Sequence, residues 1–238
     1  MVTRLALIAL LCCCQLDAAL AAPSRIIILR HGEKDNVWKL CGVGQERADA
    51  LAANYLGRNA ANSLFAAGEE PAAILAITLH TLELAAPAAA SWELPVTLYS
   101  VVPDGTPEDG KDAVLNRRTQ EAAHDIASNP EWQGKTVVMV WEHKHIASDK
   151  LERAFPGKEV TLRQLLGLDK LKDVPETWPS GNYDYFWIVD YAGSSAAPTG
   201  FRMVKQVFDG RYAKLPTNEW GAPNGLTAHS KCDLKGAE

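Results

Sequence analysis

Residues 25–34 read Arg-Ile-Ile-Ile-Leu-Arg-His-Gly-Glu-Lys, and this stretch decides the fold. Four consecutive aliphatic residues, 26–29, predict a short buried strand. The run then breaks into Arg30, His31 and Glu33, a charged cluster that a core position does not tolerate unpaired. In open α/β sheets, ligands bind at the carboxyl ends of the strands, where the N–H groups of following helices point into a crevice. The stretch therefore predicts an α/β fold with a polar site at the end of this strand.

Apolar strands and amphipathic helices alternate along the rest of the chain. We expect helices over residues 45–56, 79–92, 112–127, 146–155 and 162–166, and strands over 74–77, 95–99, 135–141, 183–189 and 201–208. This alternation predicts βα units in a three-layer α/β/α fold with a mostly parallel central sheet. The tail from residue 213 is punctuated by Pro and Gly, and we expect no regular structure there.

The first 21 residues have the pattern of a secretory signal peptide. Arg4 precedes an apolar run over residues 5–16, and Ala19-Leu20-Ala21 is a small-x-small cleavage site. We expect cleavage after Ala21, a secreted or periplasmic protein, and one domain over residues 22–238. No later stretch of the sequence is long and apolar enough to predict a transmembrane helix.

Charge and cysteine content narrow the function classes. The formal net charge is −5 and there is no basic tract, which argues against a nucleic-acid or anionic-membrane surface. Beyond residue 21 only Cys41 and Cys232 remain. In an oxidising compartment they either pair, which would tie the tail to the loop after the first strand, or stay as buried free thiols. No pattern in the sequence indicates an oligomeric state.

Two blocks of the sequence resemble the histidine phosphatase superfamily, which has the phosphoglycerate mutase-like fold. Residues 29–33 (Leu-Arg-His-Gly-Glu) match its signature, and residues 40–51 are similar to the Leu-x-x-x-Gly-x-x-Arg-Ala-x-x-Leu block that follows its catalytic strand. The resemblance implies a phosphatase that hydrolyses a small phosphorylated substrate, a phosphomonoester, through a phosphohistidine on His31. It implies neither a metal nor another cofactor.

The resemblance also implies roles for residues around His31. Arg30, and His143 after the strand at 135–141, would bind the phosphoryl oxygens. A neutral imidazole can attack phosphorus, while cationic groups stabilise the charge on the equatorial oxygens. Gly32 would let the backbone pass close to the ligand, and Lys144 could bind further anionic groups of the substrate.

Two charged residues of the matching blocks, Glu33 and Arg47, also have interpretations that do not involve the substrate. Glu33 is counted among the substrate-binding residues because it fits the motif, with a structural ion pair as its alternative. Arg47 is expected to be a solvated surface charge on the helix at 45–56.

The chain departs from the family at the second arginine. Aligning residues 84–87 (Leu-Ala-Ala-Pro) with the family's Thr-Ala-x-Pro places His80 where the Arg should be, and no Arg lies between Arg58 and Arg117. His80 would bind phosphate only when protonated, and an unperturbed imidazole titrates near ~6.5. Activity should therefore fall as the pH rises above neutral. The alternative is that His80 caps a helix or lies at the surface, in an impaired protein that binds phosphate or another anion without turnover.

A general acid is needed to protonate the leaving alkoxide. In the commonest branch of the family it lies on the loop after the third strand, which here offers Asp104 and Glu108. A solvated acidic loop is the alternative. The other branch has an Asp directly after the second His, and this chain has Lys144 there.

A metal-dependent hydrolase is the rival interpretation. His143 and His145, at i and i+2 of a strand end, would point to one face and could bind zinc together with His31 or His80. The sequence offers no carboxylate or Cys partner at ligand spacing, and Arg30 would repel the ion. We therefore expect no metal site, and we expect His145 to support the site or to lie at the surface.

Overall fold

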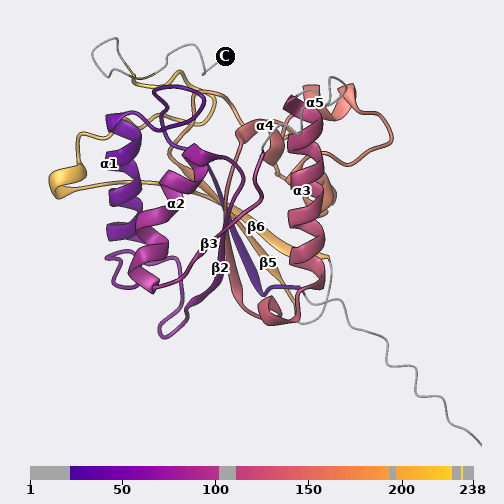
Figure 1. Cartoon of the computed structure of the whole chain (residues 1–238), viewed down its shortest axis with the longest axis horizontal. Helices are drawn as coiled ribbons and strands as arrows, with labels where there is room; N and C mark the ends of the chain where they lie inside the picture. The colour runs from indigo at the N-terminus through magenta and orange to yellow at the C-terminus, as the bar shows by residue number, and fades with distance from the viewer. Residues whose placement is uncertain (1–21, 102–110, 193–196, 227–231, 233–238) are drawn as a thin grey trace, which may run out of the picture.

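The computed structural model describes residues 22–101, 111–192, 197–226 and 232. Within them the strands form one sheet with the order β3-β2-β4-β1-β5-β6 (Figure 1). The strands are β1 (Arg25–Arg30), β2 (Pro71–Ala76), β3 (Val96–Leu98), β4 (Thr136–Trp141), β5 (Tyr185–Tyr191) and β6 (Pro198–Lys205). The first four are mutually parallel, β5 is antiparallel to β1, and β6 is antiparallel to β5. The prediction of a mostly parallel sheet is confirmed.

Helices cover both faces of this sheet (Figure 1). On one face, α1 (Gly42–Leu51) continues into a π-helical turn (Ala52–Leu56) and packs against α2 (Leu79–Trp92). On the other face lie α3 (Lys111–Ser128), α4 (His143–Ile146), α5 (Asp149–Ala154) and α6 (Leu162–Leu165). Short 3₁₀ turns occur at Pro130–Trp132, Leu168–Lys170 and Gly210–Tyr212. The arrangement is the expected three-layer α/β/α fold.

The core lies on both sides of β1. Ile26 and Ile28 belong to the apolar cluster under α3, whereas Ile27 and Leu29 belong to the cluster under α1 and α2. Successive side chains of a strand point to opposite faces, so a strand covered on both sides needs an unbroken apolar run. This requirement explains the four consecutive aliphatic residues at 26–29.

Some element boundaries differ from the prediction. The single helix predicted over 146–155 is wrong, because Ala147 and Ser148 separate α4 from α5 and the Ser148 side chain caps α5 by accepting from the N–H of Leu151. The last two strands lie a few residues from their predicted bounds. Conversely, α2 runs through Pro87 without a break.

Cys41 and Cys232 form a disulfide across 191 positions of the sequence. Cys41 immediately precedes α1, so the bond ties the C-terminal tail to the loop that follows β1. The alternative of two free thiols is therefore wrong.

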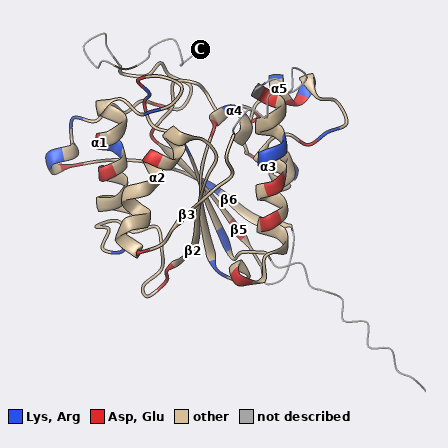
Figure 2. Cartoon of the chain, in the orientation of Figure 1, with Lys and Arg blue, Asp and Glu red and all other residues tan. Residues whose placement is uncertain are grey.

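The surface charges are mixed in sign. Figure 2 shows Lys and Arg interspersed with Asp and Glu on α1, α3 and α5, in line with the small net charge. Among the described helices, none has the length and apolar character needed to span a membrane. The predicted signal peptide lies outside the described residues.

Candidate active site

Three neighbouring parallel strands end at the same edge of the sheet and present the site. Arg30 pairs with Trp141 in the β1–β4 register, and the His31 N–H donates to the Trp141 carbonyl at 3.0 Å, so His31 and Glu142 leave the sheet side by side. His143 follows as the first residue of α4. The loop after β2 leads into α2, where His80 is the second residue.

These strand ends bring three histidines together. The centroid of the His31 ring lies 4.9 Å from that of His80 and 5.7 Å from that of His143. All three side chains are buried. The predicted convergence of Arg30, His31 and His143 is present, and His80 lies beside them. The capping or surface alternative for His80 is wrong.

The protonation pattern of His31 follows from its contacts. Nδ1 lies 2.7 Å from the Gly32 carbonyl oxygen, which can only accept, so Nδ1 carries the hydrogen. Nε2 then holds the lone pair, and it accepts from an Nη2–H of Arg30 at 3.1 Å. Burial first, and the charge of Arg30 second, hold the pKa of His31 well below its usual value. The ring is therefore neutral, with its basic nitrogen directed at Arg30 and Glu142.

Arg30 is completely buried and is oriented by a loop far away in the sequence. Its Nη1 donates to the Ser180 carbonyl at 2.6 Å and faces the carbonyls of Pro179 and Asn182 at 3.3 and 3.5 Å. Its Cζ lies 4.0 Å from the centroid of the Tyr183 ring, a cation–π distance. These contacts leave Nη2 for His31 and whatever binds in front of it.

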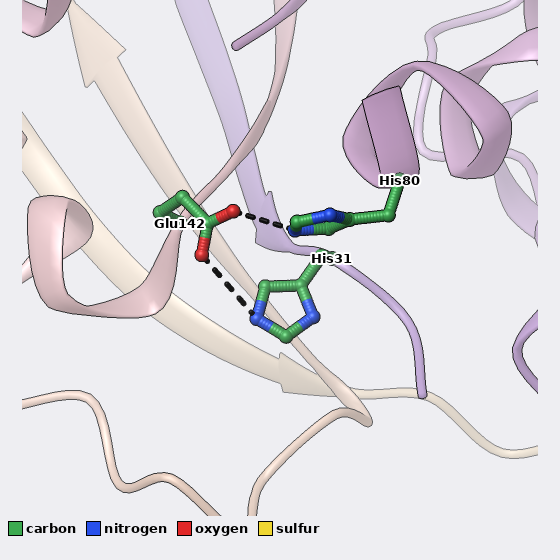
Figure 3. Close-up of side chains that lie close together, drawn as sticks. All are labelled: His31, His80 and Glu142. Atoms are coloured by element: carbon green, nitrogen blue, oxygen red, sulfur yellow. Dashed lines mark hydrogen bonds and ion pairs between the residues drawn. The ribbon is translucent and has the colours of Figure 1, made fainter. Parts of the chain in front are cut away.

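Glu142 connects two of the histidines (Figure 3). Its Oε1 lies 2.5 Å from Nε2 of His80 and accepts from the Thr78 hydroxyl at 3.1 Å, while its Oε2 lies 3.6 Å from Nε2 of His31. The Nδ1 of His80 lies 3.2 Å from the Val37 carbonyl oxygen. Both ring nitrogens of His80 thus face acceptors, an arrangement that an imidazolium satisfies.

Electrostatics distinguish the carboxylate from its neighbours. Burial alone would raise the pKa of Glu142, but the hydrogen bond with His80 outweighs it and holds that pKa well below the usual range. Burial, reinforced by Arg30, lowers the pKa of His143 well below its usual value, and its Nδ1 has no hydrogen-bond partner among the described residues. The site thus combines the Glu142 carboxylate with the neutral imidazoles of His31 and His143.

Glu33 and Arg47 form a buried ion pair. The Arg47 Nη2 lies 2.6 Å from Oε1 of Glu33, and Nε lies 2.9 Å from Oε2. Arg47 is 1 % exposed and also donates to the Pro216 carbonyl at 2.7 Å. The expectation of a solvated Arg47 is wrong, and of the two interpretations of Glu33 the structure shows the ion pair.

Gly32 and His145 are both buried. A Cβ on Gly32 would lie 3.1 Å from Leu84 and 3.3 Å from the Cα of Gly44, so the glycine allows close packing against α2 and α1. His145 lies in α4 rather than at a strand end, is buried, and its Nε2 lies 3.0 Å from the amide oxygen of Asn116. The surface prediction for His145 is therefore wrong.

Lys144, Asp104 and Glu108 are the remaining residues predicted for the site. Lys144 is exposed and lies beside His143. Asp104 and Glu108, the predicted general acids, lie outside the described residues.

Glu142 and Tyr183 are the site residues that the sequence analysis missed. The signal for Glu142 was present, because it directly follows the strand that pairs with β1. No local signal indicates that Tyr183, which lies just before β5, contacts Arg30.

Comparison with known proteins was made by sequence and by structure. No protein-family model matches the chain, and no curated protein matches it by sequence. Solved structures match across most of its length. A mycobacterial glucosyl-3-phosphoglycerate phosphatase covers 77 % of this chain and 98 % of its own at 18 % identity, with a TM-score of 0.45.

Two further structures give similar figures. The complex of that phosphatase with inorganic phosphate covers 80 % of this chain and 99 % of its own at 16 % identity, with a TM-score of 0.43. An Agrobacterium tumefaciens protein described as a candidate phosphohistidine phosphatase covers 77 % and 97 % at 14 % identity, with a TM-score of 0.40. Because these values are low, the matches assign no roles to residues, and such roles rest on the geometry of this site.

Proposed function

We propose that the protein is a phosphatase that hydrolyses a phosphomonoester through a phosphohistidine on His31. The observation that carries the proposal is the 2.7 Å contact between Nδ1 of His31 and the Gly32 carbonyl. It fixes the hydrogen on Nδ1 and leaves the Nε2 lone pair for attack on phosphorus. The lowered pKa keeps the ring in this nucleophilic form at neutral pH.

The reaction has two steps. Nε2 of His31 attacks phosphorus, the N–P bond forms, and the ester P–O bond breaks as the leaving oxygen takes a proton from a carboxylic acid. Water then attacks the phosphohistidine, the N–P bond breaks, inorganic phosphate leaves, and Nε2 regains its lone pair. Arg30, held over Tyr183, and His80, as an imidazolium, stabilise the charge on the phosphoryl oxygens in both steps.

Carboxylates would serve the two proton transfers separately. Asp104 and Glu108 remain the proposed acids for the leaving group. Glu142 is suited to the second step because it is ionised and lies beside Nε2 of His31, where it can accept a proton from the attacking water. Its Oε2, 3.6 Å from Nε2 of His31, stands where a phosphoryl group has to enter. Substrate binding therefore requires Glu142 to shift.

The proposal includes export of the protein. A cleaved signal peptide at residues 1–21 would deliver residues 22–238 to the periplasm or the exterior, where a disulfide such as Cys41–Cys232 is stable. N-terminal sequencing of the exported protein tests this, with Ala22 as the expected first residue. Retention of Met1 in the fractionated cell would contradict it.

An assay with a generic aryl phosphate tests the activity. The wild type is compared with His31→Ala and with His124→Ala, a matched exposed histidine on α3, each with and without chelator. We expect chelator-insensitive turnover in the wild type and in His124→Ala, and a loss of at least about 10³-fold in His31→Ala, since the nucleophile itself is removed. Binding of phosphate without turnover would instead support an impaired anion-binding protein, and loss of turnover with chelator would support a metal-dependent hydrolase.

A further inference from the structure

The geometry points to a divalent transition-metal site formed by His31, His80 and Glu142, of a kind that suits zinc. We propose that the ion binds the Nε2 atoms of both histidines and the Glu142 carboxylate, and that it thereby inhibits the enzyme. The inhibition rests on the proposed function, because the ion would occupy the lone pair that attacks phosphorus. The binding itself does not.

The ligand set is compact and already assembled. Ligand atoms from the three residues all lie within 4.8 Å of one another, and each residue is buried. Figure 3 shows both imidazole rings turned toward the carboxylate between them. Two imidazoles and one carboxylate, with a fourth position left for water, are a recurrent ligand set for zinc.

Two of the distances lie within about 1 Å of those that a small ion requires, and the three ligand atoms, which lie within 4.8 Å of one another, must draw closer together. Zinc bonds of 2.0–2.2 Å in a tetrahedron place neighbouring ligand atoms about 3.3 Å apart. The Glu142 Oε2 to His31 Nε2 distance is 3.6 Å, and the Glu142 Oε1 to His80 Nε2 distance is 2.5 Å. The second distance must open by less than about 1 Å, whereas a phosphoryl group has to displace Glu142.

The far side of each ring supports the same conclusion. Nδ1 of His31 faces the Gly32 carbonyl at 2.7 Å, and Nδ1 of His80 faces the Val37 carbonyl at 3.2 Å. A histidine that binds a metal through Nε2 almost always donates its Nδ1–H to such an oxygen, which fixes both the tautomer and the ring orientation. Both carbonyls are backbone groups, so this outer shell needs no further side chain.

His143 and His145 are less suited to hold the ion. His145 directs Nε2 to Asn116 at 3.0 Å, and the His143 ring centroid is 5.7 Å from that of His31. The clustered ligands found among the described residues include neither. The metal site proposed here therefore differs from the rival site suggested by the sequence.

The positive charge of Arg30, next to His31, weakens the binding of a cation. Its Nη2 donates to Nε2 of His31 at 3.1 Å, and this hydrogen bond must break before a metal bond can form. Arg30 keeps its contacts with the Ser180 carbonyl and the Tyr183 ring. The imidazolium of His80 releases its Nε2 proton to solvent as the metal–nitrogen bond forms, and no oxidation or reduction takes place.

Direct binding measurements test the site. Untagged full-length protein, freed of metal, is titrated with Zn²⁺ against a chromophoric chelator and with Co²⁺, whose visible absorption reports the ligand geometry. We expect one ion per chain in the wild type and in His124→Ala, and at least ~100-fold weaker binding in both His80→Ala and Glu142→Gln. Circular dichroism establishes whether each variant is folded. If His80→Ala does not fold, the near-isosteric Glu142→Gln still tests the site.

Inhibition is measured in the same samples. Zn²⁺ should abolish phosphatase turnover with a midpoint equal to the binding midpoint, and chelator should restore turnover. Binding that is as tight in Glu142→Gln as in the wild type would overturn the site, and turnover that rises with Zn²⁺ would overturn the inhibition. If no phosphomonoester is hydrolysed at all, the proposed function and the inhibition fail together, while the Co²⁺ spectra still decide the site.

Discussion

Nε2 of His80 lies 2.5 Å from Oε1 of Glu142, and the other oxygen of that carboxylate lies 3.6 Å from Nε2 of His31. His80, which we propose as a phosphate ligand, therefore has a buried carboxylate as its partner. A negative charge occupies the region into which a phosphoryl group must move.

Replacing Glu142 with Gln should separate binding from turnover. Inorganic phosphate, measured as a competitive inhibitor, should bind at least ~10-fold more tightly, because a unit charge at about 4 Å contributes up to several kcal/mol in a partly screened site. Turnover should fall, since the proton acceptor for the attacking water is lost. Glu131→Gln removes an exposed carboxylate and should change neither quantity. Unchanged or weaker phosphate binding in Glu142→Gln would contradict the placement of this charge.

Removing one partner of the Glu33–Arg47 pair should destabilise the fold strongly. Both side chains are 1 % exposed, so Arg47→Met leaves an uncompensated buried carboxylate, which typically costs about 3–5 kcal/mol of unfolding free energy. Urea denaturation measures it. Arg153→Ala, which breaks an exposed pair with Asp149, is the control and should cost less than about 1 kcal/mol. Equal losses of unfolding free energy in the two variants would show that the buried pair stabilises the fold no more than the exposed pair does.

Much of this site could be predicted from the sequence, because the strands that carry it are parallel. An apolar run followed abruptly by polar residues identifies the carboxyl end of a strand, and neighbouring parallel strands present those ends at one edge. His31 and His143 were assigned on that ground. Glu142 belongs to the same pattern, but the two histidines that follow it are the more specific signal for phosphoryl transfer.

Arg47 shows why other parts could not be predicted. Its helical position indicates a surface residue, and its partner Glu33 lies in a loop 14 residues earlier. Gly44 brings them together, because a Cβ there would lie 2.2 Å from the Glu33 carbonyl oxygen, so only glycine lets α1 approach so closely. The strand at Tyr185–Tyr191 begins two residues after its predicted start, because Tyr183 packs against Arg30 and the pairing with β6 begins at Tyr185.

Acid should destabilise the protein through its buried histidines. The pKa values of His31 and His143 are lowered in the folded state, whereas an exposed imidazole has a pKa near 6.5. The unfolded chain therefore binds more protons below about pH 6.5, and the unfolding free energy should fall there by up to ~1.4 kcal/mol per pH unit for each histidine. Glu142, whose pKa is also lowered, has its effect in a separate window below about pH 4.5.

Urea midpoints at about pH 7.5 and 5.5 for the wild type and His143→Gln provide the measurement. The variant should lose less stability between the two pH values, because it cannot take up that proton on unfolding. A loss as large as in the wild type would indicate that His143 is not held neutral.

The loop beside His80 should select substrates with apolar leaving groups. Val37, Trp38 and Leu79 are 55, 61 and 49 % exposed. The Val37 carbonyl lies 3.2 Å from Nδ1 of His80, and Leu79 directly precedes His80 in α2, so the backbone of these apolar residues lies next to the site. Trp38→Ser should lower kcat/KM for naphthyl phosphate by ~10-fold, the scale of one aromatic contact. Glycerol phosphate should be nearly unaffected. Val207→Ser, which changes another exposed apolar residue, should alter neither substrate.

Trapping the phosphoenzyme tests directly whether His31 is the nucleophile. The wild type is mixed with a phosphomonoester carrying a radiolabelled phosphoryl group, quenched in alkali within one turnover, and the labelled position is identified by mass spectrometry. We expect an acid-labile, alkali-stable label on Nε2 of His31, formed in a burst that precedes steady turnover and absent from His31→Ala. Turnover without a labelled His31, or a label that persists in His31→Ala, would contradict it.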